Sequence, residues 1–534
     1  MDHRNRFRLE SLGIFLIALL LFTLGIWDQQ PQGFDGRWAL FLQEMFRHGA
    51  GLFPTTYGQP YADYPGTATF FSFIFAKLFG APNHLANILP TALASAGVVA
   101  LIYRLLVPYG RSWALLTVLL TLLTTQLLEK SRSVCLDQMV ALLCVGSFYL
   151  LHTGERLGSR WRQLAVFPLF ILGFAIRGPL GLIEVCGVVC VYWALARPGE
   201  RVRQVLIHGI AGLVLLAACW WLLVKLARFS GGDGFADEVF KMQVGGRLDE
   251  TGEPFYFYFQ LSLYRYFPVV PLALATMVAL RHRWSERSDD TVQLVVRLGA
   301  CGLMILLGLS VPHFKRAYYI LPMVPMFAAV AAYGLLQAQN WLVGVRRCYE
   351  WLVVALPALC VVVVFVCRHS WQKHGYWPEV SVPLLIGALL ALQVAALIAW
   401  RRAGRLVWLS AFALLAQWLV LVTVVEPAKD LQFDTRQFVS QVEALRVSQP
   451  GPLVFVNLGK DTWAVRYMMN LAHDELPLFV SAAEVRRLAT LPRPSWVIVA
   501  RKETALLKGT PLEHLAPSFE GRLNDNPLMV FLLK

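Results

Sequence analysis

The chain has 534 residues, of which 57% are hydrophobic and 15% are charged, and its mean hydropathy is +0.55. Soluble globular domains carry about 25% charged residues, so this composition excludes an ordinary soluble protein. Repeated apolar runs of about 20 residues predict a polytopic α-helical membrane protein. The net charge of +14 does not indicate nucleic-acid binding, because the basic residues lie in short clusters between the apolar runs.

The N-terminal segment carries Arg4, Arg6 and Arg8 ahead of the first apolar run. A cleaved signal peptide would look similar, but no A-x-A-like cleavage site precedes Trp27-Asp28. We therefore expect an uncleaved first span with a cytoplasmic N-terminus.

We expect about thirteen spans. They lie near residues 11–27, 85–106, 112–128, 135–153, 164–179, 180–197, 206–226, 265–281, 294–311, 318–337, 350–367, 381–400 and 405–424. The connections at 104–111, 152–162, 197–203, 281–287, 345–350 and 401–405 are basic. The positive-inside rule assigns these connections to the cytoplasm.

The opposite, periplasmic side then receives the segments 28–84, 129–135, 177–179, 227–264, 312–317 and everything after about residue 425. Short apolar alternations at 453–457 and 496–500 predict strands in that last part. We predict a transmembrane domain over residues 1–425 and a small periplasmic α/β domain over residues 426–534. The nine cysteines lie in or beside apolar runs without metal-ligand spacing, so we interpret them as small apolar residues.

The first periplasmic loop contains an apolar stripe at helical spacing from Trp38 to Phe46, with Asp35 at its start. Asp35 is either a simple helix cap or a functional carboxylate. The segment Thr67–Phe79 predicts a second short interfacial helix, and Asp63 lies between the two helices.

Other charged residues fall on the same side of the membrane. They are Arg132 and Asp137 at the start of one span, Arg177 at a helix break, Arg247 and Glu253 in the 227–264 loop, and Lys315 and Arg316 before Tyr319. An acidic residue that enters a membrane is costly and tends to mark function, although Asp137 is close enough to the interface to reach it. Carboxylates suit a general base, whereas cations and tyrosines suit a phosphate.

These segments resemble the polyprenyl-phosphate-sugar transferases of GT-C fold, which include the protein O-mannosyltransferases and the aminoarabinose transferase that modifies lipid A. The resemblance rests on the segments 34–39, 58–65, 177–179, 253–258 and 319–322, with Arg132, Asp137 and Lys315. It covers the first ten spans in order. The thirteen spans and the outer C-terminal domain match the architecture of the aminoarabinose transferases.

The resemblance implies site residues. Asp35 takes the place of the catalytic acidic residue, and Asp137 that of the second family aspartate. Donor-phosphate contacts are implied for Lys315, Arg316, Tyr319, Arg177 and Tyr64, and other substrate contacts for Arg37, Tyr61, Asp63, Arg132, Arg247 and Glu253.

Two positions depart from the family pattern. Gly36 follows the aspartate where relatives carry Asp-Glu or Asp-x-x-Arg/Tyr, and Asp63-Tyr64-Pro65-Gly66 replaces Glu-Lys-Pro-Pro. Tyr64 therefore stands where a phosphate-binding lysine is expected. We expect no certain cofactor; a divalent metal near Asp63 is possible, although the 227–264 loop contains no histidine.

The sequence thus predicts a bacterial inner-membrane enzyme. It would transfer a monosaccharide, with inversion, from a polyprenyl-phosphate donor to a periplasmic acceptor, with a lipid A-type glycolipid favoured. The alternatives are a transferase that acts on protein or O-antigen polysaccharide, a lipid flippase or transporter, and a non-catalytic scaffold. A flippase is disfavoured because the span centres are nearly free of ionisable residues.

Overall fold

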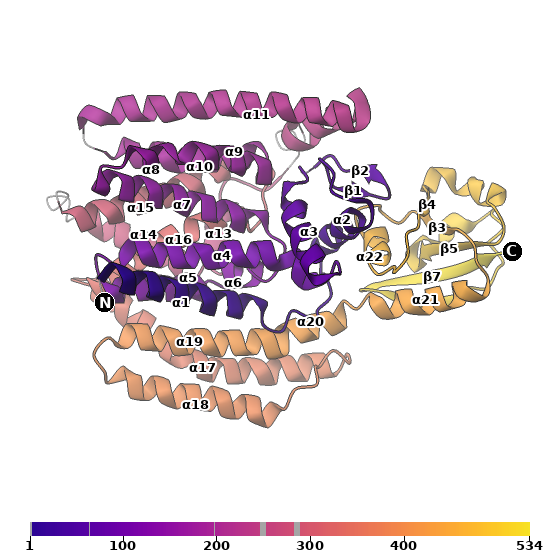
Figure 1. Cartoon of the computed structure of the whole chain (residues 1–534). Coiled ribbons are helices and arrows are strands. Elements are labelled where there is room, and N and C mark those ends of the chain that lie inside the picture. Colours follow the sequence, from indigo (N-terminus) through magenta and orange to yellow (C-terminus); the bar gives the residue numbers. More distant parts are fainter. Residues whose placement is uncertain (1–2, 64, 197, 246–251, 282–288) are drawn as a thin grey trace.

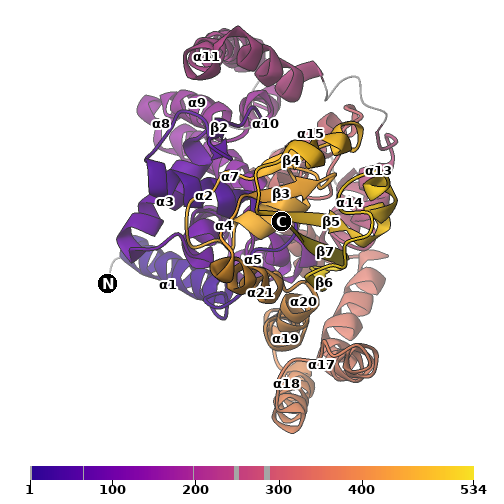
Figure 2. The ribbon, with the colours of Figure 1, turned by 90° about the vertical axis from the view of Figure 1, so that its right-hand side faces the viewer.

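The computed structural model describes residues 3–63, 65–196, 198–245, 252–281 and 289–534. A bundle of long helices forms one part of the molecule, and a smaller domain that contains a β-sheet stands at one end of it (Figure 1). Seen along the bundle, the sheet domain lies across that end (Figure 2). The N-terminus lies at the opposite end of the bundle.

Within the described residues, each of the thirteen predicted spans overlaps one main helix of the bundle, and some of these helices extend beyond the predicted bounds. These are α1 (His3–Thr23), α4 (His84–Leu106), α5 (Arg111–Leu123), α7 (Leu136–Leu157), α9 (Val166–Arg177), α10 (Pro179–Ala194), α11 (Pro198–Phe240, interrupted at Gly232), α14 (Val269–Arg281), α15 (Asp290–Ser310), α16 (Val324–Leu336), α17 (Leu342–Gln372), α18 (Val382–Trp400) and α19 (Arg405–Val420). Seven helical stretches in the described residues are long and apolar enough to cross a membrane, by length and composition. The chain is a multi-pass membrane protein.

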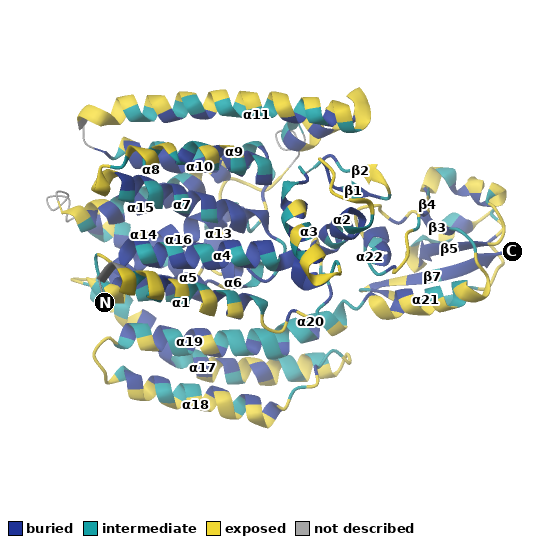
Figure 3. Cartoon of the chain, in the orientation of Figure 1, coloured by how far each residue is buried: buried dark blue, intermediate teal, exposed yellow. Residues whose placement is uncertain are grey.

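Burial in the bundle follows a layered order. Helices α4, α7 and α16 are mostly buried, whereas α11 and α18 at the two edges expose much of their surface (Figure 3). The exposed side chains of α11 include Leu213, Val214 and Trp221. Exposed apolar side chains on a helix of this length are expected to face lipid.

Shorter helices and turns connect the bundle helices. They are α6 (Thr125–Lys130), α8 (Arg160–Leu164), the π-helix η1 (Lys241–Gly245), α13 (Phe257–Ser262), the 3₁₀ turn η3 (Leu321–Met323) and the π-helix η4 (Leu421–Val425). The charged ends of α6 and α9 lie at the end of the bundle next to the sheet domain (Figure 1). This placement brings several of the predicted site residues to one end of the molecule.

The first loop folds into a small cap at that end. It contains α2 (Asp35–His48), the hairpin strands β1 (Thr55–Thr56) and β2 (Gln59–Pro60), and α3 (Thr67–Phe79). The predicted stripe on α2 is buried, including Trp38, Phe41 and Met45. Both expected short helices are present. The apolar stripe of α2 is buried, whereas α3 buries small residues and exposes Phe70, Ile74 and Leu78.

The C-terminal domain is a five-stranded mixed sheet of order β4-β3-β5-β7-β6. Its strands are β3 (Leu453–Val456), β4 (Leu478–Val480), β5 (Ser495–Ala500), β6 (Phe519–Leu523) and β7 (Asn526–Leu533). Its helices and turns are α20 (Glu426–Gln432), α21 (Arg436–Ser448), α22 (Trp463–Met468), η5 (Ala482–Thr490) and η6 (Arg501–Leu507). The two predicted strands correspond to β3 and β5, which are fully buried and therefore carry continuous apolar runs.

Hydrogen bonds fasten this domain to the cap. Gln43 and Arg47 on α2 both donate to the Leu471 carbonyl, at 2.6 and 2.7 Å. The Gln30 side-chain carbonyl accepts from the backbone and hydroxyl of Thr435, at 3.0 and 2.9 Å. The cap and the C-terminal domain are therefore joined and together cover the end of the bundle.

Candidate active site

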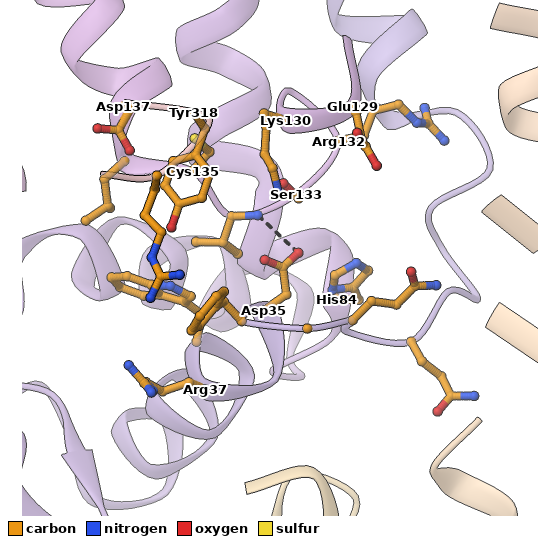
Figure 4. Close-up of a pocket in the computed structure, with 18 of the residues that line it drawn as sticks. Asp35, Arg37, His84, Glu129, Lys130, Arg132, Ser133, Cys135, Asp137 and Tyr318 are labelled. Carbon is orange, nitrogen blue, oxygen red and sulfur yellow. Dashed lines mark hydrogen bonds between the residues drawn. The ribbon is translucent and has the colours of Figure 1, made fainter. Parts of the chain in front are cut away.

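A cavity of about 610 Å³ lies between the bundle end, the cap and the C-terminal domain. Nine of the predicted site residues line it, namely Asp35, Arg37, Tyr61, Asp63, Arg132, Asp137, Arg177, Arg316 and Tyr319. The close-up shows the Asp35 and Asp137 side chains on different walls of this space, with Lys130 above Asp35 in that view (Figure 4). The tertiary structure thus gathers residues from five separate segments of the chain.

Asp35 is the first residue of α2, and its carboxylate does not cap that helix. The N-cap residue is Phe34, and it makes no side-chain capping bond. The Asp35 Oδ2 instead accepts a hydrogen bond from the Val134 backbone N–H at 3.2 Å, across the cavity (Figure 4). The explanation of Asp35 as a simple cap is therefore wrong.

Burial raises the pKa of Asp35 from its ordinary value of 3.8 to about 6. The positive charge of Lys130 and the bond from Val134 oppose this rise. A carboxylate with this pKa is deprotonated at neutral pH and is still a better proton acceptor than an exposed aspartate. The environment of Asp35 therefore suits a general base.

Asp137, at the start of α7, is paired with Arg177, at the end of α9. The Arg177 Nε donates to Asp137 Oδ1 at 3.2 Å, and both side chains are buried. The Arg177 guanidinium carbon lies 4.7 Å from the centre of the Tyr319 ring, a cation–π distance. The two residues that sequence analysis assigned to different roles form one unit with Tyr319.

Glu184 on α10 lies near this pair and was not predicted. Its carboxyl group is buried, interacts electrostatically with Asp137 and Arg177, and has no hydrogen-bond partner among the described residues. It does not line the cavity.

Most of the charged side chains on the cavity wall belong to four ion pairs. Arg132 pairs with Glu426, Arg177 with Asp137, Lys429 with Glu129, and Arg37 with Asp461, at 2.6, 3.2, 2.9 and 3.8 Å. Among the described residues of the wall, three cations have no carboxylate within ion-pair distance, namely Lys130, Arg316 and Arg466. An anion that enters the cavity would meet these three.

Lys130, at the end of α6, points into the cavity (Figure 4). Its ammonium nitrogen lies 5.3 Å from the centre of the Tyr318 ring, and its charge acts on Asp35. Lys130 was not among the site residues predicted from the sequence. The one feature of the sequence that pointed to it was its position beside Glu129 at the end of a predicted span.

Arg132, which was predicted to contact substrate, lines the cavity, but its guanidinium is already bonded to neighbouring parts of the chain. Its guanidinium donates to both carboxylate oxygens of Glu426 at 2.6 Å, and to the carbonyls of Leu21 and Leu24 at 2.8 and 2.9 Å. These bonds connect the end of α1 to α20. Arg132 therefore holds the C-terminal domain against the bundle, and most of its N–H donors are already used.

Lys315 and Glu253 also differ from expectation, because neither lines the cavity. The Lys315 ammonium donates to the Glu253 backbone carbonyl at 2.8 Å, and the Glu253 N–H donates to the His313 carbonyl at 3.1 Å. This bonding fastens the 252–254 strip to the 313–315 loop. Two further predicted residues, Tyr64 and Arg247, lie outside the described residues.

The guanidinium carbons of Arg37 and Arg316 both lie near the Phe34 ring, at 5.8 and 5.5 Å from its centre. Arg37 also lies 5.1 Å from the centre of the Tyr61 ring. The Asp63 carbonyl accepts a hydrogen bond from Gln243 of η1. These contacts order the side of the cavity that the cap contributes.

The structure gives a reason for Gly36, which departs from the family pattern. A Cβ added at this residue would lie 3.1 Å from the Met469 sulfur and 3.9 Å from Arg466 Cγ. Helix α22 of the C-terminal domain thus packs directly on the residue after Asp35. A small residue lets this helix approach the candidate base.

A divalent metal near Asp63 was considered from the sequence. Asp63 lines the cavity, but no group of three or more histidine, cysteine or acidic residues gathers in the described part of the chain. We therefore assign no metal ligands.

The chain is similar to known proteins in part of its sequence and in its fold. The family model described as dolichyl-phosphate-mannose-protein mannosyltransferase matches residues 63–223. No curated protein sequence matches significantly. Among solved structures, ArnT from Cupriavidus metallidurans in its apo state shares 14% identity and a TM-score of 0.74, and 97% of each chain is covered.

The same ArnT bound to undecaprenyl phosphate gives 15% identity, a TM-score of 0.75 and coverage of 97% of each chain. The chain has the GT-C fold of ArnT. A more distant match is the apo oligosaccharyltransferase of Archaeoglobus fulgidus, with 10% identity, a TM-score of 0.52, and coverage of 92% of this chain and 70% of the other. The GT-C fold thus extends over the whole chain, including the C-terminal domain, and the cavity lies where the two parts of that fold meet.

Proposed function

We propose that this protein is an integral membrane glycosyltransferase that moves a monosaccharide from a polyprenyl-phosphate donor to a periplasmic acceptor, with a lipid A-type glycolipid favoured. The membrane is the bacterial inner membrane, with the N-terminus in the cytoplasm and the 426–534 domain in the periplasm. Basic connections at the bundle end opposite the cavity support this orientation.

One observation carries the proposal. A buried carboxylate with a raised pKa, Asp35, shares a cavity with Lys130 and Arg316, which have no ion pair among the described residues. The base acts on the acceptor, and the cations bind the phosphate of the donor. The ArnT structure that contains undecaprenyl phosphate supports a lipid-linked donor of this class.

The reaction we propose is a single displacement. The acceptor oxygen attacks the anomeric carbon of the donor sugar, and the bond between that carbon and the phosphate oxygen breaks. Asp35 takes the proton when the acceptor is a hydroxyl, and polyprenyl phosphate leaves with the bond's electron pair. Attack opposite the leaving group inverts the anomeric centre.

The remaining predicted residues receive supporting roles. Lys130 and Arg316 stabilise the charge that develops on the leaving phosphate. Arg177, held by Asp137 and stacked on Tyr319, adds positive potential to the same wall. Arg37, Tyr61 and Asp63 line the side from which the acceptor would reach Asp35.

Mass spectrometry of cell fractions tests the proposal. Lipid A, polysaccharide and protein from cells with the wild-type protein are compared with the same fractions from cells that carry Asp35→Asn. We expect one sugar to disappear from the lipid A fraction. Its loss from polysaccharide or protein would keep the transferase and replace the acceptor, and unchanged fractions would overturn the proposal.

A further inference from the structure

The C-terminal domain contributes directly to the cavity. Asp461, Arg466 and Asn524 of this domain line it together with the cap and the bundle end. The domain therefore does more than cover the site from outside.

Arg466, on α22, lines the cavity without a carboxylate in ion-pair distance among the described residues, whereas Lys429 of the same domain is paired with Glu129. Its Nη1 is buried and has no hydrogen-bond partner among the described residues, and its guanidinium carbon lies 4.7 Å from the centre of the Trp463 ring. Burial lowers the pKa of Arg466, and the charge of Asp525 only partly offsets this effect. A half-buried cation at a cavity wall, with one buried nitrogen that lacks a partner among the described residues, favours a ligand that supplies a negative charge and a hydrogen-bond acceptor.

The position of Arg466 points to the acceptor. Its Cγ lies 3.9 Å from where a Cβ on Gly36 would be, so its stem crosses the residue next to Asp35. A donor phosphate that carries a polyprenyl tail must stay near the bilayer, where Lys130 on the bundle faces it. Arg466 belongs to the opposite wall, from which a periplasmic group enters.

We propose that Arg466 of the C-terminal domain binds an anionic group, of phosphate type, on the acceptor and holds it beside Asp35. This inference rests on the proposed function, because it names the chemistry that the acceptor side of the same cavity recognises. Arg466 is a binding and specificity residue, and the glycine at position 36 permits the close approach of Met469, which follows Arg466 at the end of α22. Arginine suits this role because its planar group binds a phosphate through two parallel hydrogen bonds.

Binding measurements with the full-length protein in nanodiscs test the inference. The probes are phosphorylated lipid A, the same lipid A without its phosphates, and undecaprenyl phosphate. The proteins are the wild type, Arg466→Ala, Arg466→Lys and the control Arg486→Ala, which removes an exposed arginine of the same domain.

We expect the wild type and Arg486→Ala to prefer phosphorylated lipid A. Arg466→Ala should bind it about 10- to 100-fold more weakly, with little change for the dephosphorylated lipid. Arg466→Lys should restore part of the affinity, which a variant that merely misfolds could not do. Undecaprenyl phosphate should bind all four proteins alike.

Three results would overturn the inference. They are equal binding of the two lipid A forms by the wild type, equal affinities of Arg466→Ala and Arg486→Ala, and a selective loss of undecaprenyl phosphate binding in Arg466→Ala. Sugar transfer is assayed separately on the same proteins. A wild type that binds phosphorylated lipid A but transfers no sugar would contradict the proposed function and leave the assignment of Arg466 standing.

Discussion

Arg177 donates a hydrogen bond to Asp137 from the end of α9 to the start of α7, with 3.2 Å between Nε and Oδ1. Both side chains are buried in the bundle. The cost of either charge at this depth is offset only while the other is present. Asp137 therefore acts on the candidate site through the arginine that it holds, and we classify it as a positioning residue.

Breaking this pair should destabilise the protein more than removing it whole. Asp137→Asn leaves the Arg177 charge without its carboxylate, and we expect a loss on the order of 3–5 kcal/mol. The double variant Asp137→Asn/Arg177→Met should lose less than the sum of the two single variants. Thermal unfolding in detergent measures all three, and additive losses would refute the coupling.

Asp35→Asn should abolish most of the transfer activity. We expect a fall of about 10²- to 10⁴-fold, because the amide cannot accept the acceptor proton. Binding of undecaprenyl phosphate should stay unchanged. Asp233→Asn, which alters an exposed carboxylate on α11, is the matched control and should keep full activity. Activity of Asp35→Asn near that of the control would remove Asp35 as the base.

The rate of transfer should rise with pH, reach half of its maximum near pH 6 and level off about one pH unit higher. Burial raises the pKa of Asp35 from 3.8 to about 6, and only the deprotonated carboxylate can accept a proton. Initial rates between pH 5 and 8 give this profile, whose acid limb should disappear from the residual activity of Asp35→Asn. A flat profile in the wild type would contradict the assignment.

The same pKa predicts the sign of an effect on stability. The folded protein holds the Asp35 proton more tightly than the unfolded chain, so this group favours folding below about pH 4. That contribution is lost as the pH rises through about 6. Asp35→Asn should therefore be more stable than the wild type at pH 7.5, by up to about 3 kcal/mol, and similar to it at pH 4. A lower thermal midpoint at pH 7.5 would contradict this expectation.

Lys130→Met should change two measurements at once. The lysine charge lowers the pKa of Asp35, so its removal should move the acid limb of the pH–rate profile to higher pH. Affinity for undecaprenyl phosphate should fall about tenfold or more, because a charge-assisted contact is lost. Lys373→Met, an exposed lysine beyond the end of α17, is the control. A weaker affinity without the pH shift would show that the Lys130 charge does not act on the pKa of Asp35.

Local sequence patterns were sufficient to predict most of the helices and two of the strands. The apolar runs predicted the positions of the main bundle helices, and the stripe from Trp38 to Phe46 predicted α2. Strands β4, β6 and β7 were missed, because β4 is short and β6 mixes polar residues with a glycine. β7 carries a continuous apolar run of the same kind as β3 and β5, so its sequence held a signal for a strand that the prediction left out.

The residues of the candidate site were predicted less completely than the elements. The side of the membrane on which a loop lies was predicted from the number of spans before it. Asp35, Asp137, Arg177 and Arg316 were therefore assigned to one side. Which of them meet depends on packing. Lys315 and Arg132 share that side as well, yet hydrogen bonds to Glu253 and Glu426 commit them to the framework.

By itself the sequence determined that the chain is a multi-pass helical protein and which charges share a face, because hydropathy and loop charge act over short stretches of chain. Only the tertiary structure decided that Asp137 holds Arg177 and that Lys130 acts on Asp35. It also decided that Arg466, more than four hundred residues after α2 in sequence, lines the same cavity. Burial and pairing of charges are long-range properties. They depend on which surfaces come together, and no local pattern records them.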